Sequence, residues 1–281
     1  MLKALEEKDS ETYIQMAYEI SMDPAHTSFP VYTDGVKTRE DFFRAAKTGM
    51  EREDEEILLF LENGEAEGVL SFYALADDRY LGVKFISVRK HYAKALEELF
   101  AYWEENYRGY EWDVYFPEEN TEALAYMSAC GRREAEENVV DVLLFDEYVP
   151  QPENEAVLSV NRENFDVFAE LHRHYEADMY WTSERIREKM DNWAIFAIEG
   201  KGAVYYNGKG GADLEIFGVD FLDGGWEAET ARGLLTACLN YAKRSGARSM
   251  YFFNDAKMHE IAAALGFRQV TTAHLFSGAI P

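Results

Sequence analysis

The sequence LEIFGVDFLDGGWEAETARGLLTACLNYAKRSG occupies residues 214–246 and decides the expected fold. Its first part is mostly apolar and predicts a strand over Leu214–Leu222. A loop with two adjacent glycines follows. A helix is predicted over Glu227–Ser245, because apolar residues recur there at helical spacing and Gly246 can end the last turn. The stretch is therefore a strand–loop–helix unit.

The same pattern stands 136 positions earlier, over residues 78–110 (DRYLGVKFISVRKHYAKALEELFAYWEENYRGY). When residues 60–116 are compared with 196–252 without a gap, 13 of the 57 pairs are identical, against about four for unrelated segments of this composition. A repeat this long is the size of a domain. We expect two copies of one fold, over residues 1–148 and 149–281, joined by a linker at Asp146–Glu155, where two of the six prolines lie.

Further elements are predicted on both sides of this unit in the second copy. Helices are expected over Asn164–Tyr175 and Glu184–Asp191, the latter with Ser183 as N-cap. Asn207–Gly211 (NGKGG) indicates a hairpin turn. The other predicted elements are the strands Ala156–Val160, Trp193–Ile198, Ala203–Asn207, Ser249–Phe253 and Gln269–Phe276 and the helix Lys257–Leu265.

The first copy gives the same order, with no opening strand visible. Its strands are predicted over Glu55–Leu61, Gly68–Leu75, Tyr80–Val88, Trp112–Phe116 and Val139–Phe145, and its later helices over Tyr92–Asn106 and Thr121–Cys130, with Asn120 as N-cap. Strands joined by tight turns are expected to be antiparallel, and strands joined through helices parallel. The predicted fold class is α/β (α+β), with two tandem domains that each hold a mixed, mostly antiparallel sheet flanked by helices.

Acidic residues dominate the charge of the chain. The formal net charge is −25, and 47% of the residues are hydrophobic, enough for packed cores. A surface this acidic repels nucleic-acid phosphates and anionic lipid, so neither partner is expected. It would attract a cationic acceptor such as an amine, although solubility alone also explains it.

The chain start and the cysteines point to a reducing compartment. The first residues, MLKALEEKDSETY, lack the apolar core of a signal peptide, and no apolar stretch approaches a membrane span. Cys130 and Cys238 lie at non-matching positions of the two copies, which argues against a disulfide or a metal site. We expect a cytoplasmic protein.

Each copy also has a late helix that ends in glycine, after its strand–loop–helix unit. In copy one that helix carries Asn120, Ala123, Tyr126 and Gly131, and in copy two it runs from Asn254 to Leu265–Gly266–Phe267. Together with the two strand–loop–helix units at 214–246 and 78–110, these late helices give an order of elements that resembles the GCN5-related N-acetyltransferase (GNAT) superfamily. The resemblance covers nearly the whole chain twice. It implies two acetyltransferase-like domains, acetyl-CoA or another acyl-CoA as co-substrate, and a small-molecule or peptide amine as acceptor.

The resemblance also implies where the cofactor binds. In the family, backbone N–H groups of the loop before the helix hold the pyrophosphate, in the pattern Arg or Gln, two residues, Gly, one residue, Gly or Ala. In copy one this pattern falls on Lys90, Ala93 and Ala95, and Arg89 and Lys94 add positive charge. A solvated basic turn is the alternative interpretation. The implied cofactor-binding residues are Val83, Phe85, Arg89, Lys90, Ala93, Lys94, Ala95 and Asn120.

Copy two departs from that pattern. Trp226, Glu229 and Ala231 stand at its three positions, and only Ala231 fits. Asp223 and Glu227 add further negative charge, and like charges within a few ångströms cost on the order of 1 kcal/mol even in a wet site. We expect at most one copy, the first, to hold an acyl-CoA.

Catalytic groups are harder to place. The family often uses a tyrosine four residues before the terminal glycine, where this chain has Met127 and Ala262. Tyr126 is therefore the candidate proton donor, and a half-buried core aromatic is the competing interpretation. Glu215 is a candidate base on a central strand. Asp77 and Asp213 match between the copies, but a role as turn residues explains them more simply.

Two further groups are weighed against simpler explanations. His172 and Glu176 are four residues apart on a predicted helix, but without further His or Cys ligands nearby a surface or partly buried pair is favoured over a metal site. The aromatic residues around Tyr175–Trp181 either roof the acceptor pocket or belong to the core.

Three functions remain open from the sequence. The first is an acyl-CoA-dependent N-acyltransferase with one degenerate domain. The second is a non-catalytic protein that kept the fold as a ligand-binding or structural module. The third, a tRNA-dependent or peptidoglycan aminoacyltransferase built from paired domains of this fold, fits poorly with the net charge of −25.

Overall fold

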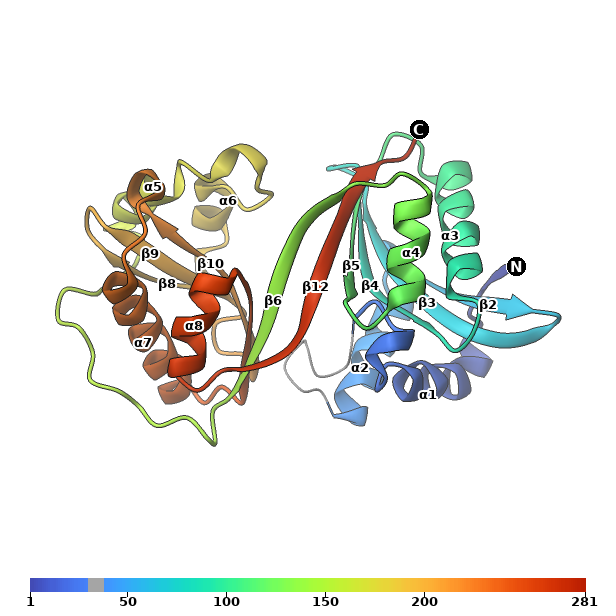
Figure 1. Ribbon diagram of the computed structural model, residues 1–281, viewed down its shortest axis with the longest axis horizontal. Helices are drawn as coiled ribbons and strands as arrows, with labels where there is room; N and C mark the ends of the chain where they lie inside the picture. The colour runs from blue at the N-terminus through green and yellow to red at the C-terminus, as the bar shows by residue number, and fades with distance from the viewer. Residues whose placement is uncertain (30–37) are drawn as a thin grey trace. The chain divides into compact units, whose positions relative to one another are not determined.

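The structure is a computed structural model that describes residues 1–29 and 38–281. It divides into two compact units. Unit 1 consists of Met1–Asn138 together with Thr271–Pro281, and unit 2 consists of Val139–Val270. Each unit is built around its own sheet and its own helices (Figure 1).

The elements of unit 1 follow the predicted order, with one strand more at the start. Its helices are α1 (Ser10–Ile20), α2 (Arg39–Met50), α3 (Tyr92–Asn106) and α4 (Thr121–Ala129). Its strands are β1 (Leu2–Ala4), β2 (Glu55–Glu62), β3 (Glu65–Leu75), β4 (Tyr80–Val88), β5 (Glu111–Pro117), the first part of β6 (Glu134–Leu144) and most of β12 (Arg268–Ala279).

The elements of unit 2 repeat this series. Its helices are α5 (Phe165–His172), α6 (Ser183–Glu188), α7 (Ala228–Arg244) and α8 (Ala256–Ala264). Its strands are β7 (Leu158–Val160), β8 (Trp193–Ile198), β9 (Gly202–Asn207), β10 (Asp213–Phe221), β11 (Ser249–Asn254) and the second part of β6. No helix in the described ranges is both long and apolar enough to span a membrane.

Each sheet is covered by helices on both faces. In unit 1 the strand order is β1-β2-β3-β4-β5-β12-β6, and in unit 2 it is β6-β11-β10-β9-β8-β7. The helices α3 and α4 share one apolar cluster with the first sheet, and α1 and α2 share another on the opposite face. In unit 2 the pair α7 and α8 covers one face of the sheet and the pair α5 and α6 the other. This arrangement is the predicted mixed, mostly antiparallel sheet flanked by helices.

The closing strand of each sequence copy joins the sheet of the other copy. β12 pairs antiparallel with β5, from Ala273 opposite Pro117 to Ala279 opposite Glu111. β6 pairs antiparallel with β11, from Leu144 opposite Ser249 to Val139 opposite Asn254. The strands joined through α3 and α7 are parallel, as predicted, since β4 pairs in parallel with β5 and β10 with β11. The closing strands instead pair antiparallel with a strand of the other copy. The division at residues 148 and 149 describes the sequence repeat, whereas the compact units exchange these two strands.

The predicted helix caps and the opening strand of the first copy compare with the structure as follows: one cap is confirmed, one is shifted by a residue, and the strand was missed. Asn120 is the N-cap of α4, as expected, and its side-chain oxygen accepts a hydrogen bond from Ala123 N at 3.1 Å. The cap of α6 is Thr182 instead of Ser183, because the Thr182 side chain accepts from Arg185 N. The first copy does have an opening strand, β1, which pairs with β2.

Two matched glycines make room for aromatic rings. A Cβ on Gly82 would lie 2.1 Å from the Tyr73 ring, and a Cβ on Gly218 would lie 2.5 Å from the Tyr205 hydroxyl. Real Cβ atoms do not approach so closely, so each ring lies across its strand only because glycine is there. The matched pair Gly82/Gly218 therefore reflects packing within the sheet.

The exchange predicts that a change in the last strand destabilises unit 1. Phe276 is buried, and its ring lies 6.2 Å from that of Phe116. We expect Phe276→Ala to lower the free energy of unfolding of unit 1 by about 3–4 kcal/mol, because it leaves a cavity in that core. Hydrogen exchange should then accelerate at the amides of β5 and stay slow in β11.

The matched control is Phe252→Ala, which removes a buried ring from β11 in unit 2. It should accelerate exchange in β11 and leave β5 protected. If Phe276→Ala instead loosened β11, the exchange of strands would be refuted.

Candidate functional site

The two central strands of unit 1 separate after a short parallel pairing. β4 and β5 are paired only from Tyr80 opposite Glu111 to Gly82 opposite Asp113. Beyond that point β4 continues to Val88 without β5 beside it, which opens a gap between the two strands. Backbone N–H and C=O groups on that edge of β4 need other partners.

A β-bulge falls inside the unpaired part of β4. Ser71 of β3 lies opposite Phe85, and Phe72 lies opposite Val83, so Lys84 is the extra residue. The bulge breaks the alternation of side chains. As a result Val83 packs toward α3 and α4, whereas Phe85 packs toward α1 and α2. The structure therefore does not bring these two predicted cofactor residues to one face.

Residues after α1 fill the gap beside β4. Ser28 binds both backbone groups of Ile86: its Oγ accepts from Ile86 N at 2.8 Å, and its N–H donates to Ile86 O at 2.9 Å. The Tyr92 hydroxyl also donates to Ile86 O, at 2.7 Å. Thr27 forms an antiparallel bridge with Ser87. The edge of β4 is thus satisfied from within the chain.

A buried polar network surrounds this contact. The hydroxyls of Ser21 and Ser87 lie 2.6 Å apart, and Thr27 Oγ1 lies 3.4 Å from Ser87 Oγ. Asn120 Nδ2 donates to Thr27 O at 3.1 Å. The Ser21, Thr27, Ser87 and Asn120 residues are wholly buried. Asn120, predicted to bind cofactor, therefore also ties α4 to the segment that fills the gap.

The predicted anion loop lies directly after the gap. His91 has a φ of 61°, and the left-handed turn there starts α3 at Tyr92. Arg89 and Lys90 are exposed, and neither forms an ion pair within the described ranges. Ala95 is buried in the core, so its small side chain serves packing against the sheet.

Carboxylates already occupy part of this loop. Ala93 N donates to Glu122 Oε1 at 3.0 Å, which places a negative charge at the N-terminus of α3. Lys94 pairs with Glu62 at 2.7 Å, and the hydrogen bond from Lys94 lowers the pKa of the Glu62 carboxyl. Of the predicted loop cations, only Arg89 and Lys90 remain without such a partner among the described residues.

Tyr126 belongs to α4, and its side chain packs against α3. Its ring stacks on Phe100 with centroids 6.5 Å apart, and burial raises the pKa of its hydroxyl. Cys130, one turn later, adds to that rise. Met127, at the family's tyrosine position, is wholly buried. A role for Tyr126 as proton donor stays a prediction.

Unit 2 shows the same separation of central strands. β10 and β11 are paired in parallel from Asp213 opposite Ser249 to Ile216 opposite Phe252. β10 then continues to Phe221, paired with β9 on one side and without β11 on the other. In unit 2 a single hydroxyl binds both backbone groups of Phe221 at the end of β10. Tyr175 OH accepts from Phe221 N at 3.1 Å and donates to Phe221 O at 3.3 Å. Tyr175 comes from the segment after α5, as Ser28 comes from the segment after α1.

The loop before α7 is longer than its counterpart and acidic. It spans residues 222–227, compared with 89–91 in unit 1. Asp223 and Gly224 both have positive φ, and Glu227 binds Thr230 Oγ1 and Lys201. Glu229 is exposed in the first turn of α7. Among the residues that the structure describes, Glu227 is the one acid of this loop that pairs with a cation, Lys201.

A buried ion pair lies beneath the α5 segment. His172 Nδ1 is 2.7 Å from Asp220 Oδ2, and His172 Nε2 donates to Trp181 O at 2.8 Å. Burial by itself would lower the pKa of His172, but the hydrogen bond and negative charge of Asp220, together with the Trp181 carbonyl, outweigh it and raise that pKa. The pair fixes β10 to the segment that carries Tyr175.

The remaining candidates from sequence have structural partners. Glu176 accepts from Ser183 N at 2.7 Å, and both ring nitrogens of His172 have hydrogen-bond partners in Asp220 and Trp181. Tyr251 OH donates to Glu215 at 2.9 Å. Trp181 packs on Trp193 with ring centroids 5.2 Å apart, which places it in the core; Tyr180 is 40% exposed.

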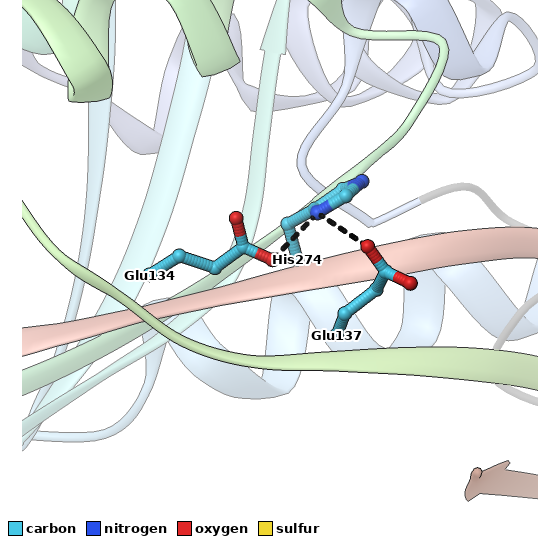
Figure 2. A group of neighbouring side chains, drawn as sticks. All are labelled: Glu134, Glu137 and His274. Carbon is cyan, nitrogen blue, oxygen red and sulfur yellow. Dashed lines mark hydrogen bonds and ion pairs between the residues drawn. The ribbon is translucent and has the colours of Figure 1, made fainter.

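One cluster was missed from sequence because strand exchange creates it. His274 of β12 approaches Glu134 and Glu137 of β6, with Nδ1 at 2.9 Å and 4.0 Å from their carboxylates (Figure 2). Both glutamates are exposed. Ser28 and Glu122 were also missed: a serine outside any motif gives no signal, and an acid in the first turn of a helix is ordinary.

Comparison with known proteins finds similar solved structures but no similar sequence. No protein-family model and no curated protein matches this sequence. Among solved structures, a GCN5-related N-acetyltransferase from Sphaerobacter thermophilus is similar over 100% of this chain and 95% of its own, with 14% identity and a TM-score of 0.68. A tandem GNAT protein from the clavulanic acid biosynthesis pathway is similar over 100% and 98%, with 12% identity and a TM-score of 0.59.

A third similar structure is an acetyltransferase-like protein from Pyrococcus horikoshii, described as a putative acetyltransferase, with 13% identity over 99% of this chain and 89% of its own and a TM-score of 0.54. Identities this low show the fold alone. The chain has the two-domain GNAT fold, as the resemblance implied.

The His172–Asp220 pair predicts a pH dependence for unit 2. Because folded His172 keeps its proton to a higher pH than unfolded His172, the folded state binds more protons there, and stability decreases as pH rises above the ordinary histidine range. We expect the free energy of unfolding of unit 2, followed by hydrogen exchange in α5, to fall as the pH rises above about 6.5 and through the raised pKa of folded His172.

His172→Gln should give lower stability and a flatter pH profile over that range. His174→Gln, at an exposed neighbour, is the control and should keep the profile of the parent chain. A parent chain whose stability is level across the range would contradict a charged His172.

Proposed function

We propose that this chain is an acyl-CoA-dependent N-acyltransferase in which one domain is degenerate. The observation that carries the proposal is the gap in unit 1: a parallel strand pair that parts after Gly82 and Asp113, directly before the N-terminus of α3. Such a gap exposes strand backbone for an extended ligand with amide groups, and the helix N-terminus favours its phosphates. The solved structures that share the fold, described as acetyltransferases, support the same activity.

The cofactor site is proposed for unit 1. Arg89 and Lys90 would meet the phosphates together with the N–H groups at Ala93 and Lys94. Ala95 N already donates to His91 O, so Ala95 would contribute only a small side chain that lets α3 pack close to the sheet. Val83, Phe85 and Asn120 stay proposed neighbours of the pantetheine chain. The first two would offer it the backbone of β4, because their side chains lie on opposite faces of the sheet. That Ala93 N–H already holds a carboxylate oxygen at 3.0 Å supports an anion at this position. Acetyl-CoA is the simplest acyl donor for such a site.

An amine is the proposed acceptor, either a small molecule or a peptide. The net charge of −25 favours a cationic partner over nucleic acid or an anionic membrane. In the reaction the amine nitrogen bonds to the acyl carbon, the carbon–sulfur bond breaks, the amine loses a proton and the thiolate gains one. Tyr126 is the proposed donor of its hydroxyl proton to the sulfur, and the proton lost by the amine would replace it on the Tyr126 oxygen. The proposed compartment is the cytoplasm.

A second candidate function is a non-catalytic module with the same fold. Its support is specific: Ser28 and Tyr92 already satisfy both backbone groups of Ile86, and Tyr175 does the same for Phe221. Met127 and Ala262, at the family's tyrosine positions, cannot donate a proton. A protein of this kind would bind acyl-CoA weakly or not at all.

Calorimetric titration with acetyl-CoA distinguishes the two functions. We expect binding to the parent chain, and a loss of at least about tenfold in affinity for Lys90→Glu, because the substitution turns an attractive charge into a repulsive one beside the phosphates. Lys47→Glu, the same change on α2 of unit 1, is the control and should bind like the parent chain.

Other outcomes assign the site differently. No binding at millimolar acetyl-CoA would reject the enzyme and favour the non-catalytic module. Binding that survives Lys90→Glu but is lost on Trp226→Ala would move the site to unit 2.

A further inference from the structure

Two parts of unit 1 stand where the proposed cofactor would bind. One is the Glu122 carboxylate, 3.0 Å from Ala93 N at the start of α3. The other is the segment Thr27–Phe29, whose Ser28 binds Ile86 in the gap. They come from opposite faces of the sheet, since Glu122 begins α4 and Ser28 follows α1. Each offers the kind of group that the site is built to bind.

Glu122 is the stand-in for an anion. A carboxylate at a helix N-terminus forms a charge-assisted hydrogen bond and interacts favourably with the helix dipole, as a phosphate would. Glu122 is exposed, so it can swing away without loss of packing. While it is in place, it both occupies the Ala93 N–H and repels a second anion.

Ser28 is the stand-in for an amide. Its Oγ accepts from Ile86 N while its own N–H donates to Ile86 O, the pair of hydrogen bonds that a bound amide would make with this strand edge. Thr27 is held by Asn120 and Ser87 and is wholly buried. Displacing this segment therefore requires several buried hydrogen bonds to break together.

From these contacts we infer that unit 1 keeps its own acyl-CoA site closed, with Glu122 at the phosphate position and Thr27–Phe29 at the chain position. The inference rests on the proposed function, because it concerns the regulation of that same site. The two closures are separable: Glu122 competes with any pyrophosphate, whereas Ser28 competes only with a ligand that carries amide groups.

Two probes separate these closures. ADP carries the pyrophosphate without the amide-bearing chain, and acetyl-CoA carries both. At low salt, where exposed charges are least screened, we expect Glu122→Gln to bind ADP and acetyl-CoA each about three- to tenfold more tightly than the parent chain. Glu122→Asp keeps the negative charge in the first turn of α4 but shortens its reach, and should show part of the same gain for both probes.

The control is Glu118→Gln, which removes one exposed negative charge between β5 and α4 and leaves the hydrogen bond from Ala93 N to Glu122 in place. Both affinities should stay within about twofold of the parent values. Circular dichroism confirms that α4 is kept in every variant. If Glu122→Gln and Glu122→Asp bind ADP no more tightly than Glu118→Gln does, Glu122 does not close the site.

The second closure is tested at Ile86 itself. In Ser28→Ala the Ile86 amide loses its acceptor, so its hydrogen exchange should become faster. Acetyl-CoA should protect that amide again, and ADP should not. Protection by neither probe in a variant that binds acetyl-CoA would overturn the part assigned to Thr27–Phe29.

Failure of the proposed function looks different. In that case neither probe binds the parent chain or any variant at millimolar concentration, Lys90→Glu included. The inference fails alone when acetyl-CoA binds the parent chain in a Lys90-dependent way but the Glu122 and Ser28 variants behave like the control.

Discussion

Backbone hydrogen bonds between β12 and β5, and between β6 and β11, are the constraint on which both sheets depend. They make β5 and β11 inner strands, and thereby remove edges that would otherwise be free to pair with another chain. The gap needs this support, because β5 leaves β4 after Asp113 and would have no partner along its second half without β12. The separation of β4 and β5 in unit 1 is therefore maintained by Ala273–Ala279 of β12.

Much of the fold follows from local sequence. The Asn120 cap, the Asn207–Gly211 turn and the long helices α3 and α7 are determined by residues next to one another, so spacing and propensity predict them. The exchange of closing strands is a choice between two similar sheets. Val140 and Leu143 would be buried in either one, and no local residue decides which.

The candidate site was likewise predictable only where it depends on residues that are close together in the sequence. Loop cations such as Lys90 can be recognised from the sequence, because the helix N-terminus that makes them a candidate anion site follows directly in the chain. Their partners cannot: Glu122 is 29 residues from Ala93, and Ser28 is 58 residues from Ile86. The β-bulge at Lys84 is equally hidden, and it sends Val83 and Phe85 to opposite faces despite their spacing. Long-range contacts of this kind decide whether a basic loop is an open site or an occupied one.

Strand exchange also governs when the protein can fold during synthesis. Ala273–Ala279 complete the first sheet, yet they are synthesised only after the whole of unit 2. Domains generally fold as units in the order in which they emerge, but here the first must wait for the end of the second. The nascent first half carries an unpaired β5 edge throughout that delay, so translation speed and chaperone access bear on the yield of this chain more than on that of a protein with independent domains.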